Sequence, residues 1–323
     1  MSLPARAGDS NYRSRMASDL LDRRFLAVIG KGGTGKTTIS ASIAVHAASQ
    51  GKRVLVAMAQ ARERMSAMLE TVVIGSEVTN ILPNIDAVNM DPDVCLEEYG
   101  LMILKVRALY KAVMDNRMVK GFLRAVPGMD AWSMLGKALF HVKEKTDDGR
   151  YRYDLVILDA PATGHGLQML RVPRVITDVA PAGLLRREAE EGLQIMRDPK
   201  LSGMVVATLA EEMPTAETEE LVATLQNDLK LPLARLVINN VLTPLFPGGS
   251  ALVERGATVL SRSPVLEGVA RAAVTRARRE ELQRRMIERL AKLPGRKVIL
   301  PSLAVERVRR PEIELLAKGL GAT

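Results

Sequence analysis

Short apolar runs separated by segments of helical composition set the pattern of the chain from residue 25 onward. Residues 25–29 are continuously apolar and end at a glycine cluster, which is typical of a parallel strand buried on both faces. Residues 37–49 have the composition of a helix that stops at Gly51, and residues 53–59 form a second apolar run. The opening therefore predicts a strand, a glycine loop, a helix and a strand in succession.

Further apolar runs predict more buried strands, and helical segments separate most of them. The runs are residues 85–90, 153–159, 203–209, 234–239 and 296–300. The clearest helical segments are residues 215–229 and 265–293. This alternation predicts an α/β fold built on a doubly wound, mostly parallel sheet.

One stretch, residues 91–145, interrupts the alternation because it contains no convincing strand and has helical composition. We expect a helical insertion at about residues 91–146 within one domain of residues 23–323, preceded by an N-terminal arm of residues 1–22. A polar turn at residues 147–149 then returns the chain to the sheet. The insertion carries Met102, Met114, Met118, Met129 and Met134. These methionines either fill the insertion's own core or line a groove for apolar helices.

Composition limits the class of protein. A chain of 323 residues with 47% hydrophobic and 26% charged residues can bury a large core, which excludes a disordered or fibrous protein. The single cysteine, Cys95, cannot form an internal disulfide or a thiolate zinc site, so we expect no zinc and a reducing compartment. No apolar run approaches the ~18 residues of a membrane span, and the first residues lack a secretory pattern, so we expect a cytoplasmic protein.

The glycine cluster after the first predicted strand carries the strongest chemical signal. Residues 30–38 read GKGGTGKTT, which fits the phosphate-loop pattern G-x-x-x-x-G-K-[ST] between a strand and a helix. Backbone N–H groups of such a loop face phosphate oxygens, Lys36 reaches the terminal phosphates, and the Thr37 hydroxyl can bind Mg²⁺. The predicted nucleotide contacts are Gly32, Gly33, Thr34, Gly35, Lys36, Thr37 and Thr38.

A second lysine, Lys31, opens the loop and is not needed to wrap phosphates within one chain. The form K-G-G-x-G-K-[ST] resembles the deviant Walker A loop of the ParA, MinD and arsenical-pump ATPases. The resemblance implies that Lys31 reaches across a dimer to the nucleotide of the other subunit, as an arginine finger does. The alternative is a solvated loop lysine.

Asp159 ends the apolar run 153–159, where α/β enzymes hold their ligands, so it is the second candidate Mg²⁺ residue beside Thr37. The sequence that follows, LDAPATGHGLQMLRVP, is similar to switch II of the arsenical-pump and tail-anchored-protein-targeting ATPases. Residues 126–135, 236–242 and 298–311 also resemble segments of that family. The resemblance implies ATP and Mg²⁺ as cofactors, adenine contact by Asn239, and Pro301 against the base.

The chain departs from the family where its strand 53–59 ends. The family carries an aspartate there that helps to position the attacking water, whereas this chain has Gln60. A glutamine amide can orient water but cannot accept a proton, so we expect weak turnover from Lys31, Lys36 and Gln60 as the catalytic set. The missing carboxylate could come from a paralogous partner.

Together these features predict a dimeric switch ATPase, either a homodimer or a heterodimer with a paralogue, that handles a hydrophobic client or a membrane partner. Two alternatives remain: a regulatory subunit that hydrolyses little ATP, and a ParA-like ATPase on DNA. The Arg-rich run 271–289 suggests the second, yet its apolar stripe fits a solvated helix packed on one side, so nucleic acid is the least favoured partner.

Overall fold

A single mixed sheet organises the protein, whose computed structural model describes residues 20–59, 63–117, 128–260 and 264–321. The strand order is β3-β4-β2-β5-β1-β6-β7-β8, and every neighbouring pair is parallel except β3 with β4. The strands are β1 (Phe25–Gly30), β2 (Val54–Ala59), β3 (Thr79–Leu82), β4 (Ile85–Met90), β5 (Leu155–Asp159), β6 (Ser202–Leu209), β7 (Leu233–Val241) and β8 (Arg296–Pro301). The doubly wound, mostly parallel α/β fold is confirmed.

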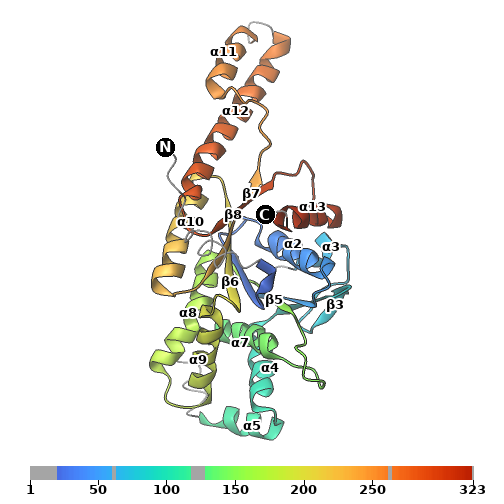
Figure 1. Ribbon diagram of the computed structural model, residues 1–323, viewed down its shortest axis with the longest axis vertical. Helices are drawn as coiled ribbons and strands as arrows, with labels where there is room; N and C mark the ends of the chain where they lie inside the picture. The colour runs from blue at the N-terminus through green and yellow to red at the C-terminus, as the bar shows by residue number, and fades with distance from the viewer. Residues whose placement is uncertain (1–19, 60–62, 118–127, 261–263, 322–323) are drawn as a thin grey trace, which may run out of the picture.

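Helices cover both faces of the sheet (Figure 1). One face packs against α2 (Lys36–Ser49), α3 (Met65–Leu69) and α13 (Arg310–Gly321). The other packs against α7 (Met129–Lys143), α8 (Thr163–Val179), α9 (Leu184–Arg197) and α10 (Glu212–Ala223), with α4 (Pro92–Leu104) and α5 (Arg107–Asp115) beyond α7. Along β1, Phe25 and Ala27 point into the second core and Leu26 and Val28 into the first, which explains why this strand is apolar throughout.

A helical hairpin projects from the body between β7 and β8 (Figure 1). It consists of α11 (Ser250–Leu260) and α12 (Pro264–Ala291). Within the described residues, no helix combines the length and apolar character needed to cross a bilayer.

Several predicted boundaries change in the structure. The helix expected at 215–229 begins at Glu212, and its last part is the π-helical segment η2 (Thr224–Asp228). The strand β3 and the helix α11 were not predicted. Residues assigned to the N-terminal arm enter the fold, because Leu20–Asp22 forms a 3-10 turn whose two leucines are buried in the core. Between residues 91 and 144, the described part is helical and contains no strand.

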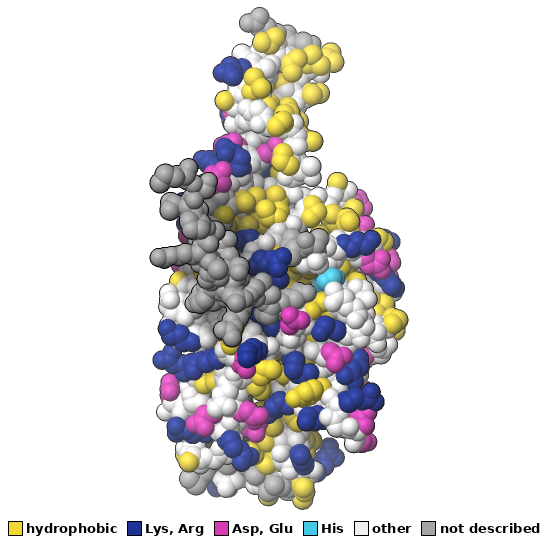
Figure 2. Space-filling view, viewed as in Figure 1, with side chains coloured by type: hydrophobic (Ala, Val, Ile, Leu, Met, Phe, Trp, Pro, Cys, Tyr) yellow, Lys and Arg dark blue, Asp and Glu magenta, His cyan; other side chains and the backbone are white. Residues whose placement is uncertain are grey.

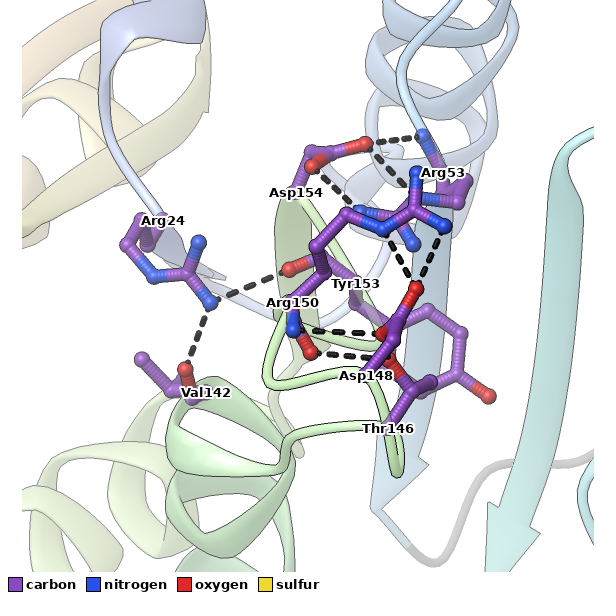
Figure 3. Close-up of polar contacts among 8 residues, drawn as sticks. All are labelled: Arg24, Arg53, Val142, Thr146, Asp148, Arg150, Tyr153 and Asp154. Atoms are coloured by element: carbon purple, nitrogen blue, oxygen red, sulfur yellow. Dashed lines mark hydrogen bonds and ion pairs between the residues drawn. The ribbon is translucent and has the colours of Figure 1, made fainter.

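Polar contacts fix the amino ends of the central strands, as Figure 3 shows. Asp154 accepts hydrogen bonds from the backbone N–H of Arg53 and from its guanidinium, at 2.9 to 3.1 Å. The Arg24 guanidinium donates to the carbonyl oxygens of Val142 (2.7 Å) and Tyr153 (3.0 Å). These bonds hold β1, β2 and β5 in register at the edge opposite the glycine loop.

The polar turn predicted at residues 147–149 is confirmed beside this network. Gly149 has a left-handed backbone, with φ +79°, and Asp148 accepts a hydrogen bond from Arg150 Nε at 2.6 Å. Thr146 donates to the carbonyl oxygen of Arg150 at 3.0 Å, which closes the turn (Figure 3). The turn therefore delivers the chain from the helical layer to the start of β5.

Candidate nucleotide site

The glycine loop lies at the carboxyl edge of the sheet, between β1 and α2. A Cβ atom on Gly30 (φ +153°) would lie 2.2 Å from the carbonyl oxygen of Ala207 in β6, and one on Gly35 (φ +88°) would lie 2.3 Å from Asn239 Nδ2. Both positions therefore require glycine. Gly35 is also the N-cap of α2 and supplies no side-chain cap, so the first N–H groups of this helix are left for a ligand or solvent.

Hydrogen bonds fix the loop at Thr34 and leave space free at Gly32 and Gly33. Thr34 is buried and its hydroxyl donates to the carbonyl oxygen of Lys31 at 2.9 Å, while Asn239 Nδ2 donates to the carbonyl oxygen of Thr34 at 3.0 Å. Gly33 (φ +85°) has no heavy atom within 4 Å of its Cβ position, and the atom nearest that of Gly32 is 3.7 Å away. The loop thus presents backbone and open space where a phosphate would lie.

Lys36 points back into this loop, and its Nζ donates to the carbonyl oxygen of Lys31 at 3.2 Å. Burial lowers the pKa of Lys36, and the charge of nearby Asp159 opposes that change in part. An ammonium group that is poorly solvated gains from any anion placed beside it. The position and surroundings of Lys36 therefore suit phosphate oxygens.

Asp159 is the last residue of β5 and is almost completely buried. Its carboxylate accepts hydrogen bonds from the Thr37 hydroxyl (2.7 Å) and the Ser40 hydroxyl (3.2 Å). Burial raises the pKa of Asp159 from 3.8 to about 6, although Thr37, Lys36 and Ser40 each favour the charged form. A carboxylate and a hydroxyl are the hard oxygen ligands that Mg²⁺ prefers, so the donor set fits this ion.

The Lys31 side chain extends from the loop to α10. Its Nζ lies 2.5 Å from Glu217 Oε1 and 3.0 Å from Met213 Sδ, both on α10. The side chains of Lys31 and Glu217 are each about one-third exposed, at 33% and 35%. The structure therefore places this lysine at the rim of the site and pairs it within its own chain.

The remaining predicted residues lie along the same edge, with one outside the described part. The Thr38 hydroxyl contacts Met68 Sδ at 3.7 Å, beside α3. Asn239 touches the loop, and Pro301 at the end of β8 pairs with Val241, two residues beyond it. Gln60 lies outside the residues that the structure describes. Adenine contact by Asn239 and Pro301 stays a prediction.

Two polar residues of the site were not predicted. Ser40 lies one helical turn after Thr37, so the helical period could have placed its hydroxyl on the same carboxylate. Glu217 lies 186 residues from Lys31 in the sequence, and no motif connects them. Only the packing of α10 beside the loop brings that pair together.

Comparisons with known proteins agree with this geometry. Residues 23–182 match a family model described as an anion-transporting ATPase. Similar proteins include the ATPase BagA of Mycobacterium tuberculosis, 25% identical over 72% of this chain and 70% of the relative. A putative arsenical pump-driving ATPase of Halobacterium salinarum is 29% identical over 72% of this chain and 38% of the relative. The ATPase GET3 of Komagataella phaffii is 24% identical over 68% of this chain and 73% of the relative.

The family-model match covers the loop, Asp159 and the first five strands. Residues 23–182 therefore belong to the anion-transporting ATPase family, and the chain is an ATPase.

Proposed function

We propose that this ATPase is a Mg²⁺-dependent switch in which two subunits close over ATP at the carboxyl edge of the sheet. The observation that carries the proposal is the arrangement around the uncapped start of α2. A partly desolvated ammonium (Lys36) and a buried carboxylate (Asp159) belong to or contact the first turn of α2, whose N–H groups have no side-chain cap, and a second lysine (Lys31) lies at the rim.

Each part of the site has a defined role in this proposal. The backbone from Gly32 to Thr38 holds the phosphates, and Lys36 binds the terminal ones. Thr37 and Asp159 would hold Mg²⁺, which supplies charge neutralisation on the phosphate oxygens when bound. Asn239 and Pro301 would contact the adenine.

Lys31 can exchange partners at low cost. Its ion pair with Glu217 is partly exposed, and such pairs contribute about 0–1 kcal/mol. A phosphate group carries more charge than one carboxylate and binds Lys31 more strongly when solvent is excluded. We therefore assign Lys31 to the nucleotide of the second subunit, where it stabilises charge on the phosphoryl group that is transferred.

The second subunit is either another copy of this chain or a paralogue. Gln60 favours slow turnover, because an amide orients water without accepting its proton. A paralogue that carries a carboxylate at that position would restore the missing group.

Gln60 also supports a second candidate function, a regulatory subunit that binds ATP and hydrolyses little of it.

The work coupled to closure is proposed to be the handling of a hydrophobic client or a membrane partner. α8 begins four residues after Asp159 and packs on α7 and α9, so a shift at the site passes into the helical layer. Met129 and Met134 are buried in the core, so they do not line an exposed client groove in this form. The thiol of Cys95 is buried as well, which gives no support to arsenic binding.

DNA is the least favoured partner for a structural reason. Arg284 pairs with Glu281 and Glu288, and Arg289 pairs with Glu219. The Arg-rich helix therefore presents neutralised side chains at these positions, whereas binding to a phosphate backbone depends on free cations.

The test of this proposal separates ATP binding from association. In Lys31→Ala, we expect calorimetry to give an ATP affinity close to that of the wild type, while ATP-dependent association measured by sedimentation weakens at least tenfold. Glu217→Gln is the matched control, because it frees Lys31 and should leave association equal or stronger. An equal loss of binding and association in Lys31→Ala would contradict the role across subunits.

A further inference from the structure

The α11–α12 hairpin leaves the sheet at the same edge as the phosphate loop. β1 and β7 are both parallel to β6, so the carboxyl ends of β1 and β7 lie at one edge. β1 leads there into the loop, and β7 leads into the hairpin. The hairpin and the loop therefore lie at the same edge, where a second subunit that closes on the loop would also lie.

The base of the hairpin is fixed to the body. Gln283 is buried, its Oε1 accepts the N–H of Leu242 at 2.8 Å, and its Nε2 donates to the carbonyl oxygen of Asn240 at 3.2 Å. Glu280 accepts the N–H groups of Leu245 and Phe246 at 3.1 to 3.2 Å. From Gln283 back to its first residue, α12 extends for about 28 Å. The hairpin is thus a firmly based projection rather than a loose loop.

Small residues line the inside of the hairpin. Ala257 on α11 and Ala270 and Ala277 on α12 are buried, and the Arg278–Glu254 ion pair joins the two helices at 2.7 Å. The helices therefore approach closely through alanine, and their larger aliphatic residues are left on the outside.

The outer aliphatic side chains form what we call the hairpin face. Val265 is 84% exposed and Val259 is 64% exposed. The hairpin face consists of Leu252, Val259, Leu260, Val265, Leu266 and Val269. Figure 2 shows hydrophobic side chains gathered on the projecting hairpin. A patch of this kind amounts to roughly several hundred Å² of apolar surface, which marks an interaction surface on soluble proteins.

We infer that the hairpin face packs against a second copy of this chain when two subunits close over ATP. This inference rests on the proposed function, because closure at the phosphate loop brings the second copy within reach of a 28 Å projection from the same edge, a length of about nineteen helical residues. In a two-fold symmetric dimer the hairpin face of each copy packs against the other copy, so two hairpin faces are buried per dimer. Two such patches supply apolar area on the scale of a standard interface of about 1,600 Å².

The chemistry of the tip favours a protein surface over lipid. Residues 250–271 contain three arginines and two glutamates, and neither lysine nor an aromatic residue. Both glutamates are paired, Glu254 with Arg278 and Glu267 with Arg271, each at 2.7 Å. Helices that lie on anionic membranes are rich in lysine and arginine and carry Trp or Phe anchors. The nearly neutral aliphatic tip resembles the centre of a protein interface instead.

Cross-linking tests the contact directly. Cys95 is buried, so a cysteine introduced as Val265→Cys in the full chain can be labelled selectively with a benzophenone maleimide. On illumination with Mg²⁺ and a non-hydrolysable ATP analogue, we expect a covalent species of twice the 35.2 kDa chain mass. The same label on the exposed α13 position, Leu315→Cys, should give none.

A second measurement uses variants on the surface. Val259→Ser, Val265→Ser and Val269→Ser combined should weaken ATP-dependent association at least tenfold and leave ATP affinity at sub-associating concentration unchanged. The matched control combines changes at three exposed positions elsewhere, Val73→Ser, Val179→Ser and Leu315→Ser, and should associate like the wild type.

The outcomes distinguish this inference from the function on which it rests. A wild-type chain that stays monomeric with the analogue and has no co-purifying paralogue overturns the proposed closure and this inference with it. A chain that associates only with a paralogue overturns this inference alone. A wild-type dimer that gives no cross-link and tolerates the triple change overturns this inference alone. Label transfer only to lipid in vesicles of phosphatidylglycerol and phosphatidylcholine would also overturn it and assign the hairpin to a membrane.

Discussion

Replacing Asp159 by asparagine should stabilise the protein in the absence of Mg²⁺. The pKa of this buried carboxyl rises from 3.8 to about 6, so holding it charged costs about 3 kcal/mol above pH 6. The amide of Asp159→Asn avoids that cost but weakens one of the two hydroxyl bonds from Thr37 and Ser40, a loss of about 1 kcal/mol. The net gain is therefore about 2 kcal/mol near pH 7.5.

The gain should disappear in acid. A raised pKa means that the folded protein holds the proton more tightly than the unfolded chain, so this group stabilises the fold below pH 3.8 and loses that contribution as pH rises to about 6. At pH 4.5 the buried charge of Asp159 still destabilises the wild type by about 1 kcal/mol. The weaker hydroxyl bond destabilises the Asp159→Asn variant by about the same amount. The difference between variant and wild type should fall to about zero there.

Urea unfolding in EDTA measures the difference in free energy of unfolding between variant and wild type at pH 7.5 and at pH 4.5. The signal is the fluorescence of Trp132, which is the single tryptophan and is buried. Asp154→Asn is the control of opposite sign, because the bond from Arg53 lowers the pKa of Asp154 and its loss should destabilise the protein at pH 7.5. The same Asp159→Asn protein should lose the Mg²⁺-dependent part of its ATP affinity. A variant less stable than the wild type at pH 7.5, or a gap that does not change with pH, would refute this reasoning.

Two further changes probe the loop and the missing carboxylate. Gly30→Ala forces a Cβ to 2.2 Å from the carbonyl oxygen of Ala207, so we expect urea unfolding to show a free energy of unfolding lower by about 3 kcal/mol or more. Gly33→Ala places its Cβ in open space and should lower the free energy of unfolding by about 1 kcal/mol. An equal cost at both glycines would show that the contact does not limit the loop. Gln60→Asp should raise phosphate release by the isolated protein, and an unchanged rate would remove the explanation given for this position.

The sequence predicted the central sheet well because its strands are continuous apolar runs buried on both faces. β3 escaped prediction because Ile81 is its single buried residue, and its antiparallel pairing depends on the neighbouring β4. α11 escaped for a related reason: its larger aliphatic residues point outward, so their pattern does not mark a core-facing helix. Local periodicity predicts helices and strands that bury one apolar face. β3 and α11 bury few apolar side chains, so this signal is weak for both.

The site divides in the same way. Residues 30–38 form a local motif, and the structure places them as that motif requires. By contrast, Ser40 meets Asp159 across 119 positions of sequence, and Lys31 meets Glu217 across 186. Such pairs arise only once the sheet order places β5 beside β1 and α10 beside the loop, so no single-sequence pattern specifies them.

Sedimentation velocity with and without nucleotide tests the central claim most directly. Closure of two subunits over ATP predicts that the purified 35.2 kDa chain doubles its mass when Mg²⁺ and a non-hydrolysable ATP analogue are added, alone or together with a paralogue that co-purifies with it. A species that binds the analogue in calorimetry and still sediments at the mass of one chain, with no co-purifying partner, would contradict the claim.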